Sequence, residues 1–303
     1  MKAIEVISGN IRKNLSLGKA KHYVIEGEVH VTKGVTLTIA DGATLLIVNG
    51  VFPKSQLRRS ALIFDQGSVL QAKRFQVKAA GANHRPVRFA DNGGIWFLGN
   101  YADARTDNDD RDGLAVKVNR KNPLSRFTAQ TISTSYLGRK DSYVSTKTGK
   151  QLDIGDDLDG FSLLGVGPTE WNVSTVRVAH SADDGFDLTN SNIRLDRLEV
   201  KAPTEDALNL CSSRLEVRRS LALDVTKTGY TDRDIFDFET DDGPAMLVLY
   251  KNCWVRVKGV FGDELVMSSK DMPTPYTASN NERKYEFSGR LKKSAMIYSI
   301  ERD

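Results

Sequence analysis

A five-residue pattern that recurs at nearly constant spacing constrains the fold of this chain more than any other feature. Each copy reads Asp, a residue that is usually small or apolar, an apolar residue, a mostly polar residue and an apolar residue. The copies start 25, 22, 28 and 29 residues apart, at Asp159, Asp184, Asp206, Asp234 and Asp263. A longer β-prone run and turns follow the first four copies. Repeats of this length, with two or three short strands each, are typical of one coil of a β-solenoid.

Stacked coils would place equivalent residues in columns, because each strand pairs in parallel with its equivalent in the next coil. Strand side chains alternate between faces, so two apolar columns should point inward and one column outward. We expect the inward columns to be Phe161, Phe186, Leu208, Phe236 and Leu265, and Leu163, Leu188, Leu210, Phe238 and Met267. The outward column, facing solvent or a ligand, should be Ser162, Asp187, Asn209, Asp237 and Val266.

The rest of the chain supports an all-β fold, because helical periodicity is nearly absent and short β runs closed by Gly, Asp or Asn are frequent. We predict one right-handed parallel β-helix, a β-solenoid, over residues 1–303. An antiparallel sandwich is the alternative, but it does not explain the repeats in register. The predicted parts are N-terminal coils over 1–100, an irregular insertion over 101–152, regular coils over 153–267 and a C-terminal cap over 268–303.

Composition excludes several classes of protein. Lys and Arg number 43 against 39 Asp and Glu, and the interspersed charges argue against a nucleic-acid partner. The sequence contains no run of 18 apolar residues, so we predict no membrane insertion. The two cysteines, Cys211 and Cys253, make no disulfide framework. No signal peptide is visible, so a cytoplasmic or phage-related protein and a mature extracellular form both stay open.

Several segments resemble a known group of proteins. They are a "G-x-V-x-V-x-x-G-x-x-L-x-I-x-x-G-x-x-L" opening, an aliphatic "LGN" strand, and "GVG-x-TEW" followed by "DDGF". These motifs, within residues 7–100 and 158–210, are similar to those of bacterial, mostly secreted right-handed parallel β-helix proteins of the pectate-lyase-like class. The resemblance implies the fold and leaves the activity open. The chain departs from the group at Thr204–Ala207, where a second Asp-rich motif is expected.

The repeated acidic residues are candidates for chemistry, since stacked coils would bring them about 4.8 Å apart. The candidate catalytic residues are Asp184, Asp187, His180, Glu205 and Asp206. A Ca²⁺ ion, which prefers several carboxylate oxygens, could bind Asp159, Asp183, Asp184 and Asp206. The resemblance fits this cofactor, because lyases of that class often combine Ca²⁺ with a basic residue. Alternatively, each Asp only accepts backbone N–H bonds in its turn.

A polysaccharide or glycan surface is the expected partner. Trp171 could stack on a sugar ring or fill the coil interior, and Lys201 and Arg177 would lie beside a groove. Tyr136 and Tyr143 could form an exposed aromatic surface on the insertion. The leading function is carbohydrate binding or processing, with a lyase or hydrolase using the acidic ladder as one form of it. A non-catalytic adhesion module, or an oligomeric structural segment of a phage or surface assembly, is the alternative.

Overall fold

The protein is all-β in the part of the chain that a computed structural model describes. The described residues are 3–50, 60–105, 114–139, 142–144, 151–153, 159–225, 234–261, 267–268 and 283–299. They contain no helix, and therefore no helix long and apolar enough to cross a membrane. The strands are β1 (Ala3–Ile7), β2 (Leu15–Leu17), β3 (Lys21–Ile25), β4 (Glu28–Val31), β5 (Thr36–Ile39), β6 (Ala43–Val48), β7 (Ala61–Phe64), β8 (Val69–Ala72), β9 (Arg74–Ala80), β10 (Gly94–Leu98), β11 (Ala104–Arg105), β12 (Ala115–Val116), β13 (Arg126–Ser135), β14 (Ser142–Val144), β15 (Gln151–Asp153), β16 (Phe161–Leu164), β17 (Trp171–Ala179), β18 (Phe186–Thr189), β19 (Asn192–Lys201), β20 (Leu208–Cys211), β21 (Arg214–Asp224), β22 (Ala245–Leu249), β23 (Trp254–Phe261), β24 (Met267–Ser268), β25 (Arg283–Arg290) and β26 (Ala295–Ser299).

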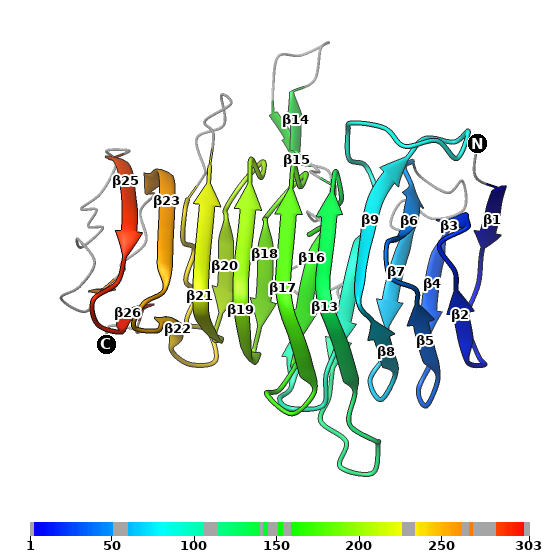
Figure 1. Ribbon diagram of the computed structural model, residues 1–303, viewed down its shortest axis with the longest axis horizontal. Helices are drawn as coiled ribbons and strands as arrows, with labels where there is room; N and C mark the ends of the chain where they lie inside the picture. The colour runs from blue at the N-terminus through cyan, green and yellow to red at the C-terminus, as the bar shows by residue number, and fades with distance from the viewer. Residues whose placement is uncertain are drawn as a thin grey trace.

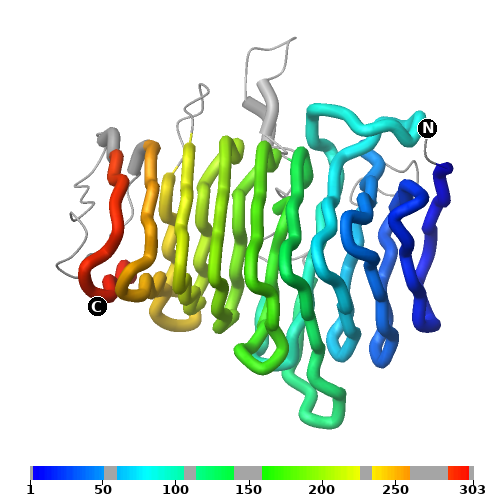
Figure 2. The backbone as a smooth tube through the Cα atoms, in the orientation of Figure 1, coloured from blue at the N-terminus to red at the C-terminus, as the bar shows by residue number. Residues whose placement is uncertain are grey.

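Two sheets carry the architecture. A 16-stranded sheet contains the run β1-β3-β6-β9-β13-β17-β19-β21, paired in parallel, and a six-stranded sheet runs β4-β7-β10-β16-β18-β20, also in parallel. The long strand β13 pairs with β8 through its first half and with β9 through its second half. The strands lie side by side along the long axis, with β1 at one end and β25 at the other (Figures 1 and 2).

The register of the six-stranded sheet confirms the parallel alignment of the first four repeats. Ser162 pairs with Asp187, Asp187 with Asn209, and Asn209 bridges to Asp237. The fifth copy is different. Residues 262–266 lie outside the described residues, Leu265 and Val266 among them, and Met267 pairs antiparallel with β26. The parallel stacking therefore gives way to antiparallel pairing near the C-terminus, where β22 also pairs with β26 and β23 with β25.

The core lies between the sheets and consists of the predicted inward columns. All of their members up to Phe238 are buried and belong to one apolar cluster. Aromatic rings stack from one strand to the next, with centroids 5.0 Å apart for Phe64 and Phe97 and 5.3 Å apart for Phe161 and Phe186. Burial of this many large side chains, each worth roughly 1.5–3 kcal/mol, is the main stabilising term.

The prediction for the outward column is wrong in one respect, because Ser162, Asp187 and Asn209 are buried. Other parts of the chain cover the outer face of the six-stranded sheet around β7, β10 and β16. The β11–β12 hairpin packs Ala104 and Val116 on Leu98 and Leu164 there. In the same row as Ser162, Trp96 donates an indole N–H bond of 2.9 Å to the carbonyl of Asp159. A face that alternation predicts as exposed is thus a second buried layer.

The insertion predicted over 101–152 is also wrong in extent. Residues 126–135 form β13, which belongs to the large parallel sheet and buries Phe127 and Ile132 in the core. The segment before it folds back on the body, where Asn100 donates to the carbonyl of Asn119 at 2.9 Å. The antiparallel pair β14–β15 projects beyond the large sheet, at the top of Figure 1.

Candidate functional site

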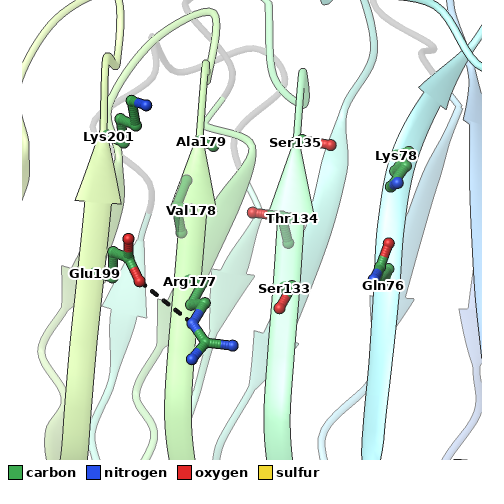
Figure 3. A pocket seen from close by; sticks show the side chains of 10 residues that line it. All are labelled: Gln76, Lys78, Ser133, Thr134, Ser135, Arg177, Val178, Ala179, Glu199 and Lys201. Atoms are coloured by element: carbon green, nitrogen blue, oxygen red, sulfur yellow. Dashed lines mark ion pairs between the residues drawn. The ribbon is translucent and has the colours of Figure 1, made fainter. Parts of the chain in front are cut away.

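A shallow groove lies on the outer face of the large sheet, across β9, β13, β17 and β19 (Figure 3). Its volume is about 260 Å³. Strand alternation explains its lining, because Phe75, Val77, Val176 and Val178 point into the core and the residues between them point out. The side chains that face the groove are Gln76, Lys78, Ser133, Ser135, Arg177, Glu199 and Lys201.

Parallel pairing arranges these side chains in two rows that run across the strands. One row is Gln76, Ser133, Arg177 and Glu199, and the other is Lys78, Ser135, Ala179 and Lys201. Adjacent members of a row lie about 4.8 Å apart, the distance between paired strands. The groove therefore presents hydrogen-bonding groups at a regular spacing along the molecule.

The groove carries a net positive charge. Lys78, Arg177 and Lys201 contribute three cations against the single carboxylate of Glu199. Arg177 Nε lies 3.3 Å from Glu199 Oε2, in an ion pair whose side chains are both about half exposed. Figure 3 places Lys78 and Lys201 at the two sides of the groove, where no dashed line joins them to another residue drawn. This surface favours anionic or strongly hydrogen-bonding ligands.

A stacked pair of rings stands at the end of the groove strands. The rings of Tyr136 and His180 are 4.8 Å apart at an interplanar angle of 11°. Both residues adopt positive φ, 58° and 56°, directly after β13 and β17, and Ala202 after β19 does the same at 49°. A residue in the left-handed conformation thus follows each of the three strands at the same level. The rings of Tyr136 and His180 therefore stack on one another. His180 is exposed, as a contact residue would be.

The acidic ladder lies in the turn that leads from β17 and β19 to the six-stranded sheet. Asp184 Oδ1 accepts the backbone N–H of Asp206 at 2.9 Å. Asp206 Oδ1 in turn accepts the backbone N–H of Asp234. Asp184 and Asp206 therefore each tie their turn to the turn of the next repeat, in agreement with the structural alternative in which the Asp residues accept backbone N–H bonds.

Burial gives this ladder unusual electrostatics. Asp183, Asp184 and Asp187 are buried. The pKa of Asp206 is raised well above its usual value, first by burial and then by the negative charge of Asp184. Asp237 and Asp234 raise it further, whereas the Asp234 N–H bond lowers it. The ladder thus favours a proton on Asp206.

Three carboxylates of the turn could hold a cation. One oxygen each of Asp183, Asp184 and Glu205 lies within 4.8 Å of the other two. Of the predicted Ca²⁺ ligands, Asp159 and Asp206 are not part of this group, and Glu205 joins it. Three oxygens fit a hard cation, but they are fewer than the six to eight that Ca²⁺ takes, and Asp184 also holds the Asp206 N–H.

The remaining predicted ligand-binding residues divide between the groove and the core. Arg177 and Lys201 line the groove, and Tyr136 stands beside it. Trp171 is buried against Phe97 and Phe161, so it fills the interior and offers no sugar platform. The side chain of Tyr143, in β14, lies outside the described residues. Asp187, in β18, is buried on the six-stranded sheet and does not face the groove.

Glu170 has a structural role that the sequence did not reveal. Its buried carboxylate accepts backbone N–H bonds from Asn100 at 2.9 Å, Ser125 at 3.1 Å and Gly167 at 2.9 Å. Burial raises the pKa of Glu170, and these bonds offset part of the rise. The Glu of the "GVG-x-TEW" motif therefore holds three loops together through hydrogen bonds.

Sequence reasoning also missed two residues of the groove, Gln76 and Lys78, although the alternation of Arg74–Ala80 marks them as outward-facing.

Comparison with known proteins gives no relative from which a role could be transferred. No protein-family model, curated protein or solved structure matches this chain.

Proposed function

We propose that this protein is a right-handed parallel β-helix that binds carbohydrate on the outer face of its large sheet. The observation that carries the proposal is the groove lined by Arg177 and Lys201, two residues singled out for this role from the sequence. The pectate-lyase-like motifs support the same fold and leave the class of ligand to the chemistry of the groove.

The chemistry of the groove suits sugar rings. Its amide, hydroxyl, guanidinium and ammonium groups can donate to the hydroxyl and carboxylate oxygens of a polysaccharide, and Glu199 and the hydroxyls can accept. The stacked rings of Tyr136 and His180 offer an aromatic surface beside it. An open groove on a rigid sheet also admits a polymer without requiring a chain end.

Binding without catalysis agrees better with the acidic ladder than hydrolysis does. Cleavage of a glycosidic bond needs two carboxyl groups that flank the bond, roughly 5 to 10 Å apart. Asp184 and Asp187 are buried, and Asp184 and Asp206 both hold backbone N–H groups. We infer that these carboxylates maintain the turns and leave recognition to the groove.

Affinity electrophoresis through gels that contain neutral or acidic polysaccharides tests the proposal. The wild-type protein should be retarded by at least one polysaccharide, and Lys201→Ala and Arg177→Ala should each reduce the retardation several-fold. Lys19→Ala, which removes an exposed cation from the turn before β3, is the matched control and should behave as wild type. Migration unaffected by every polysaccharide would refute carbohydrate binding.

A Ca²⁺-dependent lyase or hydrolase is the second candidate, favoured by the approach of Asp183, Asp184 and Glu205 to one another. A bound cation would raise the melting temperature with the logarithm of its concentration. We expect no such rise for wild type or for Asp183→Asn, and no release of short products. A Ca²⁺-dependent rise of the melting temperature in wild type alone, reversed by EDTA and accompanied by polysaccharide cleavage, would favour a Ca²⁺-dependent enzyme over a protein that only binds carbohydrate.

A further inference from the structure

We propose that the N-terminal end of the molecule binds an extended acidic peptide, which adds as a strand to the free edge of β1. This end is separate from the groove, because β3 and β6 lie between β1 and the nearest groove strand, β9. The inference therefore does not depend on the binding of carbohydrate.

The N-terminal strands are paired on one side only. Among the described residues, β1 pairs with β3 alone and β2 pairs with β5 alone. Between these strands, the N–H of Ile11 donates to the carbonyl of His30 at 2.8 Å, and the carbonyl of Ile11 accepts the N–H of Thr32 at 3.1 Å. All of these bonds run toward the following strands. Within the described chain, the other edge of β1 therefore presents unpaired backbone groups, which are a template for an added strand.

Apolar side chains of β1 are exposed beside this edge. Ile4 is 48% exposed and Val6 is 45% exposed. The register places Val6 in one row with Val24 of β3 and Leu46 of β6, which are buried in a small apolar cluster. Val6 is thus the uncovered last member of a row that is otherwise buried. On the opposite face of β1, Ile7 packs partly against the core. A strand with apolar residues at alternate positions would extend the row over Val6.

A hollow beside β1 carries positive charge. Its volume is about 490 Å³, and it is lined by residues 6–15, which lead from the end of β1 to the start of β2. Arg12 and Lys13 line the hollow and are exposed, and neither forms an ion pair with a described residue. Lys21, by contrast, pairs with Glu5 at 2.7 Å. The two unpaired cations favour carboxylate side chains on the incoming strand.

Charge also argues against a second copy of this chain as the occupant. Head-to-head contact would place Arg12 and Lys13 of both copies at one interface. Head-to-tail contact would bring them to the β25–β26 end of the molecule, where Arg290, Lys292 and Lys293 are exposed (Figure 1). Like charges repel across either interface. A peptide that alternates apolar and acidic residues instead matches both the exposed apolar side chains of β1 and the nearby cations.

The test uses three labelled peptides of eight residues, long enough to cover the five residues of β1, and measures their binding to the full chain by fluorescence polarisation. In the first peptide Val and Glu alternate. The second is the same peptide with its two central residues methylated on the backbone nitrogen, which removes one N–H group from each edge. The third has Lys in place of Glu. We expect wild type to bind the first peptide at least tenfold more tightly than either of the others, and the first peptide should slow amide hydrogen exchange in β1.

Three variants locate the binding. Val6→Glu should weaken binding of the Val/Glu peptide at least tenfold, because it replaces the apolar contact with a like charge. Leu124→Glu is the matched control, since Leu124 is 49% exposed and lies outside β1 and the hollow, and it should bind as wild type does. Arg12→Ala combined with Lys13→Ala should weaken binding about fivefold and make it less sensitive to salt. All these side chains are exposed, so the melting temperatures should stay unchanged.

Four results would overturn the proposal. No binding of the Val/Glu peptide, or unchanged binding in Val6→Glu, removes the site from β1. Equal affinity for the methylated peptide shows that no strand is added. A preference for the Lys peptide contradicts the acidic class of partner. Sedimentation of wild type as a dimer and of Val6→Glu as a monomer assigns the edge to a second copy. None of these results bears on the groove, which affinity electrophoresis tests separately.

Discussion

Two carboxyl groups have pKa values displaced in opposite directions. The pKa of Asp206 is raised, because its partly covered carboxyl is shielded from water and lies beside other carboxylates, Asp184 first among them. Burial by itself would also raise the pKa of Glu216, but hydrogen bonds from Tyr250, Arg214 and Arg194 lower it to about 2. The same functional group, a carboxyl, therefore responds to pH with opposite effects on stability at these two positions.

Asp206→Asn should flatten the dependence of stability on pH. Because the folded pKa of Asp206 is raised, its contribution is full below the unfolded value of about 3.9 and is lost as pH rises through the folded pKa. The Asn carbonyl can still accept the Asp234 N–H. Thermal unfolding between pH 4 and pH 8 should show a smaller decline for the variant than for wild type. Asp206→Ala, which leaves that N–H unbonded, should lose about 1–3 kcal/mol at every pH. A steeper decline in the Asn variant contradicts the assignment.

Glu216→Gln should give the opposite profile. Because the folded pKa is lowered to about 2, the contribution of Glu216 is present above the unfolded value of about 4.3 and is lost as pH falls toward 2. Its carboxylate accepts bonds of 2.7 Å from Arg194 and Tyr250 and 2.8 Å from Arg214. The variant should be less stable by about 1–3 kcal/mol in urea at pH 7. At pH 2 its stability should approach that of wild type, and an undiminished difference there would refute the charge-based explanation.

At the scale of the element, close approach between neighbouring backbones fixes the stacking of the six-stranded sheet. A Cβ added to Gly99 would collide with the carbonyl oxygen of Gly165, and one added to Gly94 would collide with that of Gly160. These glycines follow and begin β10, whose next strand in the sheet is β16. The glycine of the "LGN" motif, Gly99, therefore allows the backbones of adjacent strands to approach each other closely.

Gly99→Ala should therefore destabilise the protein without changing its secondary structure. The new methyl group must displace the Gly165 backbone, and overpacking of this kind costs about 1–3 kcal/mol. Denaturation in urea measures the loss, and a far-ultraviolet dichroism spectrum checks that the sheets persist. Gly42→Ala is the control, because Gly42 lies in a turn with positive φ and no atom lies within 4 Å of the added Cβ. Its loss of stability therefore reports backbone strain alone, without a steric clash. Wild-type stability of Gly99→Ala would contradict the contact.

The elements also mark how far sequence reasoning extends. The Asp repeats predicted the order and register of β16, β18 and β20, because stacking preserves the spacing between equivalent residues. They did not predict β13, since the many Ser, Thr, Lys and Arg residues of Asn119–Gly149 gave its segment the polarity of an insertion. They also did not predict the burial of Asp187, because the alternation of side chains along a strand carries no information on what packs against either face. The alternation of side chains along a strand shows which residues share a face. Whether that face is exposed to solvent depends on long-range packing.

At the scale of the whole molecule, the parallel strands make an elongated body with a repetitive outer face (Figure 2). Residues far apart in the sequence, such as Lys78 and Lys201, line the two sides of one groove on that face because each repeat advances the chain by one strand spacing. The sequence identified Arg177 and Lys201 but not their neighbours from β9 and β13, since the intervening chain breaks the repeat. We therefore propose that the large sheet recognises the ligand and that the acidic turn supports the fold.

One paired measurement tests that assignment most directly: the dissociation constant of an acidic polysaccharide for wild type, Lys201→Ala and Asp184→Asn, determined by calorimetry. The exposed Lys201 lies in the groove, whereas the buried Asp184 lies in the turn. We expect Lys201→Ala to weaken binding about fivefold or more with an unchanged melting temperature. Asp184→Asn should keep wild-type affinity, whatever its effect on stability. Loss of binding in a folded Asp184→Asn variant, with Lys201→Ala unaffected, would contradict binding in the groove and would place the binding site at the acidic ladder.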